Sequence, residues 1–164
     1  MSVTARIVLL INFIVFGFGV FEFINYANAR TEKLNTITIK RDLGGSLSDY
    51  IMKYVVLAKH GTSVIIDGEC DSACTLMVGI LDRDKICITE KAQLGFHASG
   101  YVDGLGKTQY DADGGRTLSE SGTRLMLDFY PRDIRRWIDK NGGLGQDIIN
   151  LKQPEISKYF EPCK

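Results

Sequence analysis

Along the first half of the chain, the spacing of apolar residues changes from that of a strand to that of a helix and back again. Residues 36–39 alternate and are β-branched, which is typical of a strand, whereas residues 63–66 form the continuous apolar run of a buried parallel strand. Between them, residues 47–59 carry apolar side chains at three- and four-residue spacing, and Gly61 follows. This half therefore predicts strands that alternate with a helix.

The second half continues the alternation around one long irregular segment. The small and apolar residues 73–81 predict a buried helix that begins at or beside Ser72, with strands at 85–89 and 93–97. The glycine-rich residues 99–121 predict a mobile loop of the kind that often carries a binding site. Beyond it we expect helices over 123–130 and 131–140, an extended piece over 147–151 and a last helix opened by Pro154. The whole order favours an α/β fold with parallel strands.

The N-terminus has the layout of a signal peptide. A single positive charge at Arg6 precedes an apolar run over 7–21, and a small-x-small triplet follows at 27–29. We therefore expect residues 1–29 to be removed on export and residues 30–164 to form one periplasmic or secreted domain.

An uncleaved anchor is the alternative for the same segment. Residues 7–29 could cross a bilayer if Glu22 lies at the outer interface, which would tether the domain to the membrane. In both cases the domain faces an oxidising space.

The four cysteines fit an exported domain with two disulfides. The sequence allows three pairings. We favour Cys74 with Cys87, which would tie a helix to the next strand, and Cys70 with Cys163, which would pin the C-terminus. A metal site is the competing interpretation, but paired C-x-x-C spacing is missing and the chain has only two histidines. We therefore expect no metal site.

Composition and charge narrow the class of protein further. The chain has 164 residues, of which 45% are hydrophobic and 24% charged, as in globular domains. Twenty basic residues offset twenty acidic ones, so the net charge gives no sign of a nucleic-acid partner.

Several residues together fit an acyl-transfer hydrolase, which needs a nucleophile, a base and N–H donors for the oxyanion. Ser72 lies at a strand-to-helix junction, where the N–H of Ala73 would face developing negative charge. Gly45, in a tight turn, has no side chain to block its own N–H and is the second candidate donor. His97, at a strand end, would be the base.

The order of these elements resembles the proteolytic subunit of Clp protease, in the superfamily that includes the crotonases. As in that family, Ser72 stands among small residues at a helix start and His97 ends a strand, over roughly residues 36–98, with a weaker similarity at Pro154-Glu155. The resemblance implies a single ClpP/crotonase-like domain, a repeated β-β-α spiral with mostly parallel strands. Together with the N-terminal export signal, it implies an exported serine hydrolase, most simply a peptidase, that acts on a peptide or small acyl substrate and needs no cofactor.

The chain departs from the family in two ways. The family's third catalytic residue is an Asp, and here the carboxylate in the corresponding stretch is Asp147, with Asn150 as a weaker orienter. The chain is also shorter than the Clp subunit, so the barrel-shaped oligomer and its ATPase partner are not carried over. We expect a monomer or a small homo-oligomer.

Other interpretations of the same residues stay open. Asp71 and Ser72 could be an ordinary helix cap, and His97 a satisfied strand-end histidine. The domain could be a catalytically inactive ClpP-like binding module in the periplasm. A crotonase-like site for an acyl thioester is disfavoured by export, because coenzyme A is cytoplasmic. Finally, a reduced Cys70 or Cys74 could be the reactive group.

Overall fold

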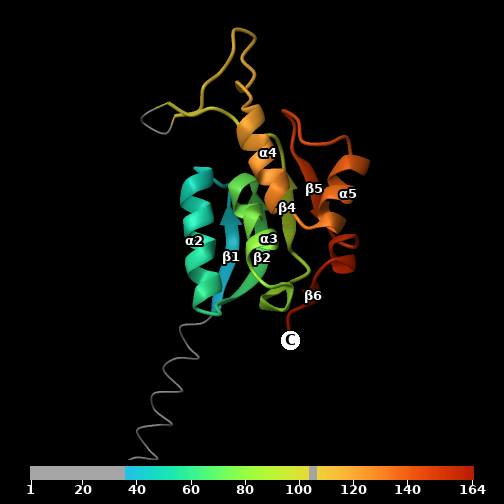
Figure 1. Cartoon of the computed structure of the whole chain (residues 1–164). Coiled ribbons are helices and arrows are strands. Elements are labelled where there is room, and N and C mark those ends of the chain that lie inside the picture. The colour runs from blue at the N-terminus through green and yellow to red at the C-terminus, as the bar shows by residue number, and fades with distance from the viewer. Residues whose placement is uncertain (1–35, 104–106) are drawn as a thin grey trace, which may run out of the picture. The chain divides into compact units, whose positions relative to one another are not determined.

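Residues 36–103 and 107–164 are described by the computed structural model and form a mixed α/β domain (Figure 1). The expected signal peptide or anchor, residues 1–29, lies outside the described residues and stays a prediction. Within the described ranges, no helix is long and apolar enough to span a bilayer.

One sheet organises the domain, with strand order β5-β4-β2-β3-β6 and β1 beside β2. The pairs β2–β3, β2–β4 and β3–β6 are parallel, and β4–β5 is antiparallel, so the expectation of mostly parallel strands is confirmed. A regular β-β-α repeat is not evident in the element order, and this finer description stays a prediction. The strands are β1 (Thr36–Asp42), β2 (Ser63–Asp71), β3 (Ile86–Ile88), β4 (Gln93–Phe96), β5 (Ile149–Lys152) and β6 (Glu161–Pro162).

The helices cover the sheet largely where the apolar spacing predicted them. The expected helix over 73–81 differs, because it is a 3-10 turn followed by one short α-helix. Within the 3-10 turn, the Thr75 hydroxyl donates to the Ser72 carbonyl at 2.6 Å. The last helix is likewise a single 3-10 turn. The helical elements are α2 (Leu47–Lys59), η1 (Ser72–Leu76), α3 (Met77–Ile80), η2 (Arg83–Lys85), α4 (Glu120–Phe129), α5 (Arg132–Lys140) and η3 (Ile156–Lys158).

The core lies between the sheet and these helices. Phe96 of β4 packs edge-on against Tyr130, with ring centroids 5.3 Å apart, and 5.7 Å from the ring of Trp137. The predicted buried stripe of α5 is confirmed, because Ile134, Trp137 and Ile138 are all buried. The residue that follows Phe96 is His97, so this packing fixes the end of β4 from which the imidazole projects.

All four cysteines form disulfides, but with partners other than those favoured from the sequence. The bonds are Cys70–Cys74 and Cys87–Cys163, so the pairing Cys74–Cys87 with Cys70–Cys163 is wrong. The parallel register of β3 and β6 sets Cys87 opposite Glu161, close to Cys163. Cys70 lies near the end of β2 and is only four residues before Cys74. Because both of these sulfurs are bonded, a free thiol beside the serine is also excluded in this structure.

The segment expected to be a structureless loop is a β-arm, which comprises residues 99–103 and 107–119 of the described chain. Its backbone segments pair with one another: the Tyr101 N–H donates to the Thr117 carbonyl at 2.8 Å, and the Ser119 N–H to the Ser99 carbonyl at 2.8 Å. These are isolated bridges rather than long strands, and the arm leads directly into α4.

Candidate active site

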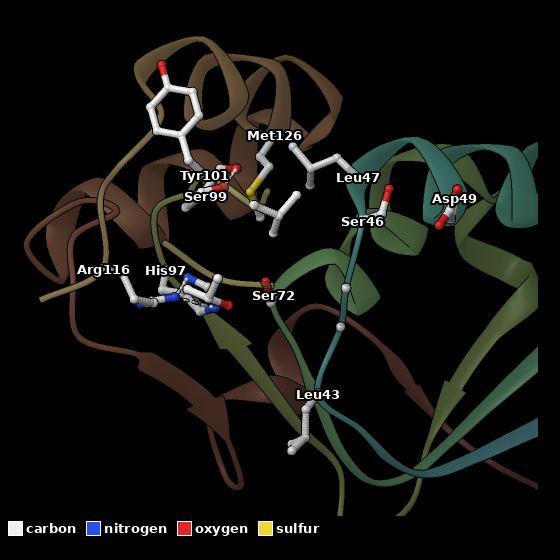
Figure 2. Close-up of a pocket in the computed structure, with 15 residues that line it drawn as sticks. Leu43, Ser46, Leu47, Asp49, Ser72, His97, Ser99, Tyr101, Arg116 and Met126 are labelled. Atoms are coloured by element: carbon white, nitrogen blue, oxygen red, sulfur yellow. Dashed lines mark hydrogen bonds between the residues drawn. The ribbon is translucent and has the colours of Figure 1, made fainter. Parts of the chain in front are cut away.

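The pairing of β2 with β4 brings Ser72 and His97 to one edge of the sheet. Asp71 lies opposite Gly95 in this parallel pair, and Ser72 and His97 stand just beyond the carboxyl ends of their strands. Both side chains line a pocket of about 470 Å³, together with the turn that follows β1 and residues of the β-arm (Figure 2). The structure therefore places the two predicted reacting residues in the same cavity.

Ser72 has an unusual backbone conformation for a residue with a side chain. Its φ is +58°, in the left-handed region, and no other non-glycine residue in the described ranges has a positive φ. Ser72 is the first residue of η1 and directly follows β2, so this conformation lies at a strand-to-helix turn. Its hydroxyl makes no hydrogen bond within the described part of the chain, so Oγ is free to meet a ligand.

The Gly44-Gly45 turn is packed against this serine. Gly44 has φ +81°, and a Cβ on it would lie 2.7 Å from the Ser72 Cβ and 2.8 Å from the Ala73 nitrogen. The Gly44 N–H donates to Asp42 Oδ1 at 3.0 Å. By contrast, the N–H groups of Gly45 and Ala73 donate to no group of residues 36–103 and 107–164. The two predicted oxyanion donors are thus unoccupied near Ser72.

His97 is buried, with 7% of its surface exposed. Its Nδ1 lies 2.7 Å from the carbonyl oxygen of Ala98. If Nδ1–H donates there, the neutral ring keeps its lone pair on Nε2, as a general base requires. Burial lowers the pKa of His97, and the nearby positive charge of Arg116 lowers it further, whereas the Ala98 hydrogen bond opposes both. Burial therefore favours the neutral form of the imidazole.

Arg116, from the β-arm, lies directly against this imidazole (Figure 2). Its Nη1 is 2.7 Å from His97 Nδ1 and 3.2 Å from Nε2, and its Nη2 donates to the Gln146 carbonyl. The Gln146 side chain donates back to the Arg116 carbonyl at 2.6 Å. Sequence reasoning missed Arg116, because it stands in an aperiodic segment and carries no motif.

The structure does not bring Asp147 to His97. Asp147 is exposed, and no hydrogen bond joins it to the imidazole in the described part of the chain. The Ala98 carbonyl occupies the position of the partner that the carboxylate was expected to provide. The catalytic role of Asp147 thus has no geometric support and stays a prediction.

Asp71, the residue before the serine, does not cap the helix that follows. It stands at the N-cap position of η1 but its side chain accepts no capping hydrogen bond, so the ordinary cap interpretation lacks its defining contact. Its Oδ1 is buried without a hydrogen-bond partner in the described residues, and burial, followed by the charge of Glu69, raises its pKa.

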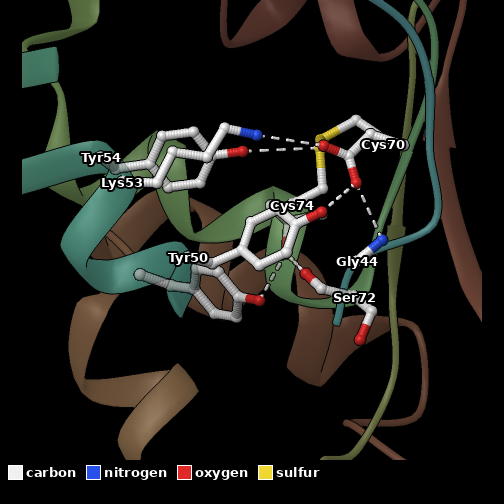
Figure 3. The surroundings of a disulfide bond; sticks show 10 residues. Gly44, Tyr50, Lys53, Tyr54, Cys70, Ser72 and Cys74 are labelled. Atoms are coloured by element: carbon white, nitrogen blue, oxygen red, sulfur yellow. Dashed lines mark hydrogen bonds and ion pairs between the residues drawn. A yellow bond between two sulfur atoms is a disulfide. The ribbon is translucent and has the colours of Figure 1, made fainter. Parts of the chain in front are cut away.

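The Cys70–Cys74 disulfide closes the turn on both sides of Ser72 (Figure 3). Both cysteines are fully buried against α2, where the Tyr54 hydroxyl lies 3.7 Å from the Cys74 sulfur. From the same helix, Tyr50 donates to Asp42, the residue that also accepts from Gly44. One cluster of contacts therefore holds both the serine turn and the glycine turn.

Within the described ranges, no three His, Cys, Asp or Glu side chains come close enough together to hold a metal ion.

Comparisons with known proteins add a remote likeness in fold. No protein-family model and no curated protein matches the chain. Among solved structures, it is similar to a ClpP1 mutant from Listeria monocytogenes, with a TM-score of 0.37 and 12% identity, covering 79% of this chain and 91% of that chain. A likeness of this size assigns no activity, so the chemistry of the pocket depends on its own geometry.

Proposed function

We propose that this domain is an exported serine hydrolase, acting on a peptide or small acyl substrate, with Ser72 as the nucleophile and His97 as the base. The observation that carries the proposal is the left-handed conformation of Ser72 at a strand-to-helix turn, in a pocket shared with a buried neutral imidazole. A strained residue with a free hydroxyl persists only where the surroundings hold it, and such positions cluster at active sites.

Ser72 and His97 line the same pocket, but no hydrogen bond joins them in the described part of the chain, so the proposed reaction needs the two side chains to approach each other. His97 Nε2 accepts the Ser72 proton as Oγ attacks the substrate carbonyl carbon, and the N–H groups of Gly45 and Ala73 hold the oxyanion. His97 then gives the proton to the leaving group, which departs as the carbonyl re-forms. Water, activated by the same imidazole, hydrolyses the acyl-serine and regenerates the hydroxyl.

Two observations support export as part of the proposal. The two disulfides are compatible with an oxidising compartment, and the N-terminal sequence has the layout of an export signal.

A binding module without turnover is the second candidate function. It is favoured by the contact of Arg116 with both ring nitrogens of His97, because a cation at the lone pair competes with the serine proton and weakens the base. It predicts that ligands bind the pocket and that none is hydrolysed.

Hydrolysis of a neutral activated ester, 4-nitrophenyl butyrate, separates the two functions. For the full-length oxidised chain we expect saturable turnover that Ser72→Ala lowers at least 100-fold, because the covalent route is lost. Ser99→Ala, which removes another serine hydroxyl of the same pocket, is the matched control and should retain turnover. Equal rates for the wild type and Ser72→Ala would contradict the proposal.

A further inference from the structure

Arg116 is a cation of the pocket without an anionic partner. The ion pairs of the described chain join other residues, and no carboxylate of residues 36–103 and 107–164 pairs with Arg116. Its contacts with His97 and with the Gln146 carbonyl use only part of the five N–H donors of a guanidinium. Arg116 lines a cavity of about 470 Å³, which is wide enough for a ligand.

The contact between Arg116 and His97 is also poorly satisfied. His97 Nδ1 lies 2.7 Å from the Ala98 carbonyl, which needs a donor, and 2.7 Å from Arg116 Nη1, which needs an acceptor. One ring nitrogen cannot be both. With the proton on Nδ1, the ring donates to Ala98, and Arg116 is left with the longer contact to the Nε2 lone pair, at 3.2 Å. An anion that accepts from Nη1 would replace this longer contact with a charge-assisted hydrogen bond, which is shorter and stronger.

We infer that Arg116 binds the carboxylate of the substrate's leaving group, so that the enzyme releases the C-terminal residue of a peptide. This inference rests on the proposed function, because it names the substrate class of the same site. In the free protein, Arg116 rests against the imidazole; a bound carboxylate takes over its Nη1–H and leaves the His97 Nε2 lone pair to Ser72.

The side of the scissile bond follows from the chemistry of His97. The imidazole gives its proton to the departing amine, so the leaving group must lie beside the ring. Arg116 touches that ring, and a carboxylate bound to it belongs to the leaving residue rather than to the acyl part. The guanidinium plane favours this ligand because it pairs with both carboxylate oxygens.

The rest of the pocket is compatible with this orientation. Arg116 and Asp49 line opposite sides of the cavity, with Ser72 between them (Figure 2). The two-way hydrogen bonding with Gln146 anchors the arginine backbone and part of its guanidinium, so the charge stays in place when the ring contact is lost. The acyl part would extend from Ser72 toward Leu47 and Met126, the apolar side of the pocket.

Binding to the full-length Ser72→Ala chain tests the inference without turnover. The probes are acetyl-alanyl-alanine, which has a free carboxylate, and its neutral C-terminal amide. Binding is followed by NMR through the imidazole C–H resonances. The chain has only two histidines, and His60 is exposed and does not line the pocket, so it is an internal reference.

We expect the acid to shift the His97 resonance saturably and to bind about ten-fold or more tightly than the amide, as for a charge-assisted hydrogen bond. Arg116→Gln should abolish this preference, and Arg136→Gln, which removes an exposed charge from α5, should keep it. Equal binding of acid and amide, no binding of the acid, or a preference that survives Arg116→Gln would overturn the inference.

Release of alanine from the same acid by the wild-type chain separates this inference from the proposed function. Arginine-dependent binding without release would leave the carboxylate site standing and contradict hydrolysis. Hydrolysis of neutral esters at Ser72, without an acid preference in binding, would contradict only the carboxylate site.

Discussion

At Ser72, a residue with a side chain occupies the left-handed region of backbone space, at φ +58°. For an L-residue this conformation costs roughly 1–2 kcal/mol, because Cβ crowds the following carbonyl. Gly44 removes the other source of crowding, since a Cβ there would lie 2.7 Å from the Ser72 Cβ. The molecule thus tolerates local strain at a residue that presents its hydroxyl to the pocket.

A change of charge beside His97 should move its pKa in a known direction. Burial and then Arg116 hold this pKa below the ordinary value of 6.5, so Arg116→Gln should raise it while burial still keeps it below 6.5. The midpoint of the acid limb of kcat/KM for the neutral ester should rise with it. An NMR titration of the imidazole C–H resonance measures the pKa directly, and an unchanged or lower value in Arg116→Gln would contradict this account.

The same lowered pKa has a consequence for stability, whose sign is opposite to that of a histidine with a raised pKa. Below pH 6.5 the unfolded chain binds a proton at His97 more readily than the folded chain does, so the free energy of unfolding falls as the pH drops toward the lowered pKa. Well above pH 6.5, His97 is neutral in both the folded and the unfolded chain, so it no longer makes the free energy of unfolding depend on pH.

At this scale, the sequence could predict that Ser72 and His97 belong to one site, but not what surrounds them. Ser72 and His97 each follow a readable strand, and the parallel register then brings them into one pocket. Arg116 could not be found, because its position depends on how the β-arm folds back. The prediction of Asp147 depends only on its place in the chain. The His97 ring instead contacts the backbone carbonyl of Ala98, and a carbonyl is present at every residue, so no sequence pattern marks it.

Among the elements, the turn that carries Ser72 is the most tightly constrained. The Cys70–Cys74 bond joins the last residues of β2 to η1 across a sequence separation of 4 residues, and α2 covers it. The hydroxyl therefore depends on two elements whose relative position is covalently fixed.

Removal of this bond should affect reactivity more than stability. The Cys70→Ala/Cys74→Ala variant should lose about 2 kcal/mol of unfolding free energy, since the closed loop is short. Ester turnover should fall at least ten-fold, because the left-handed turn loses its clamp. Urea unfolding and kcat measure the two effects, and full turnover in the variant would show that the clamp is not needed.

The elements that the sequence predicted well are those with a clear period. The helix over 47–59 has the bounds of α2, and β2 begins at the predicted residue but continues to Asp71 because mixed polar positions there still pair with β4. The β-arm was missed, because its strands meet only at isolated bridges and leave no alternating pattern.

On the scale of the whole molecule, the second disulfide ties the C-terminus to the sheet. Cys87 lies on β3, and Cys163 follows β6, the edge strand that pairs with β3. The bond closes the chain across a sequence separation of 76 residues, which includes β4, the β-arm and both long C-terminal helices. It therefore restricts the unfolded chain far more than Cys70–Cys74 does.

The Cys87→Ala/Cys163→Ala variant should accordingly lose about 4 kcal/mol of unfolding free energy, more than the variant without the short loop. Ester turnover per folded molecule should stay near that of the wild type, because neither cysteine lines the pocket. Urea unfolding of the two double variants side by side makes the comparison; a smaller loss for this pair would contradict the assigned roles of the two bonds.

The overall α/β class and the mostly parallel sheet could be predicted because they follow from the alternation of strand and helix. The disulfide pairing could not, since it depends on which strand becomes the neighbour of β6, a long-range choice that no local pattern encodes.

The most direct test of the central claim is covalent labelling of the full-length oxidised chain with a fluorophosphonate, followed by peptide mass spectrometry. The account predicts one adduct, at Ser72, formed at a rate that His97→Ala lowers at least 100-fold and that Ser99→Ala leaves largely intact. An adduct at another residue, or no adduct on the folded chain, would contradict the assignment of Ser72 as an activated nucleophile.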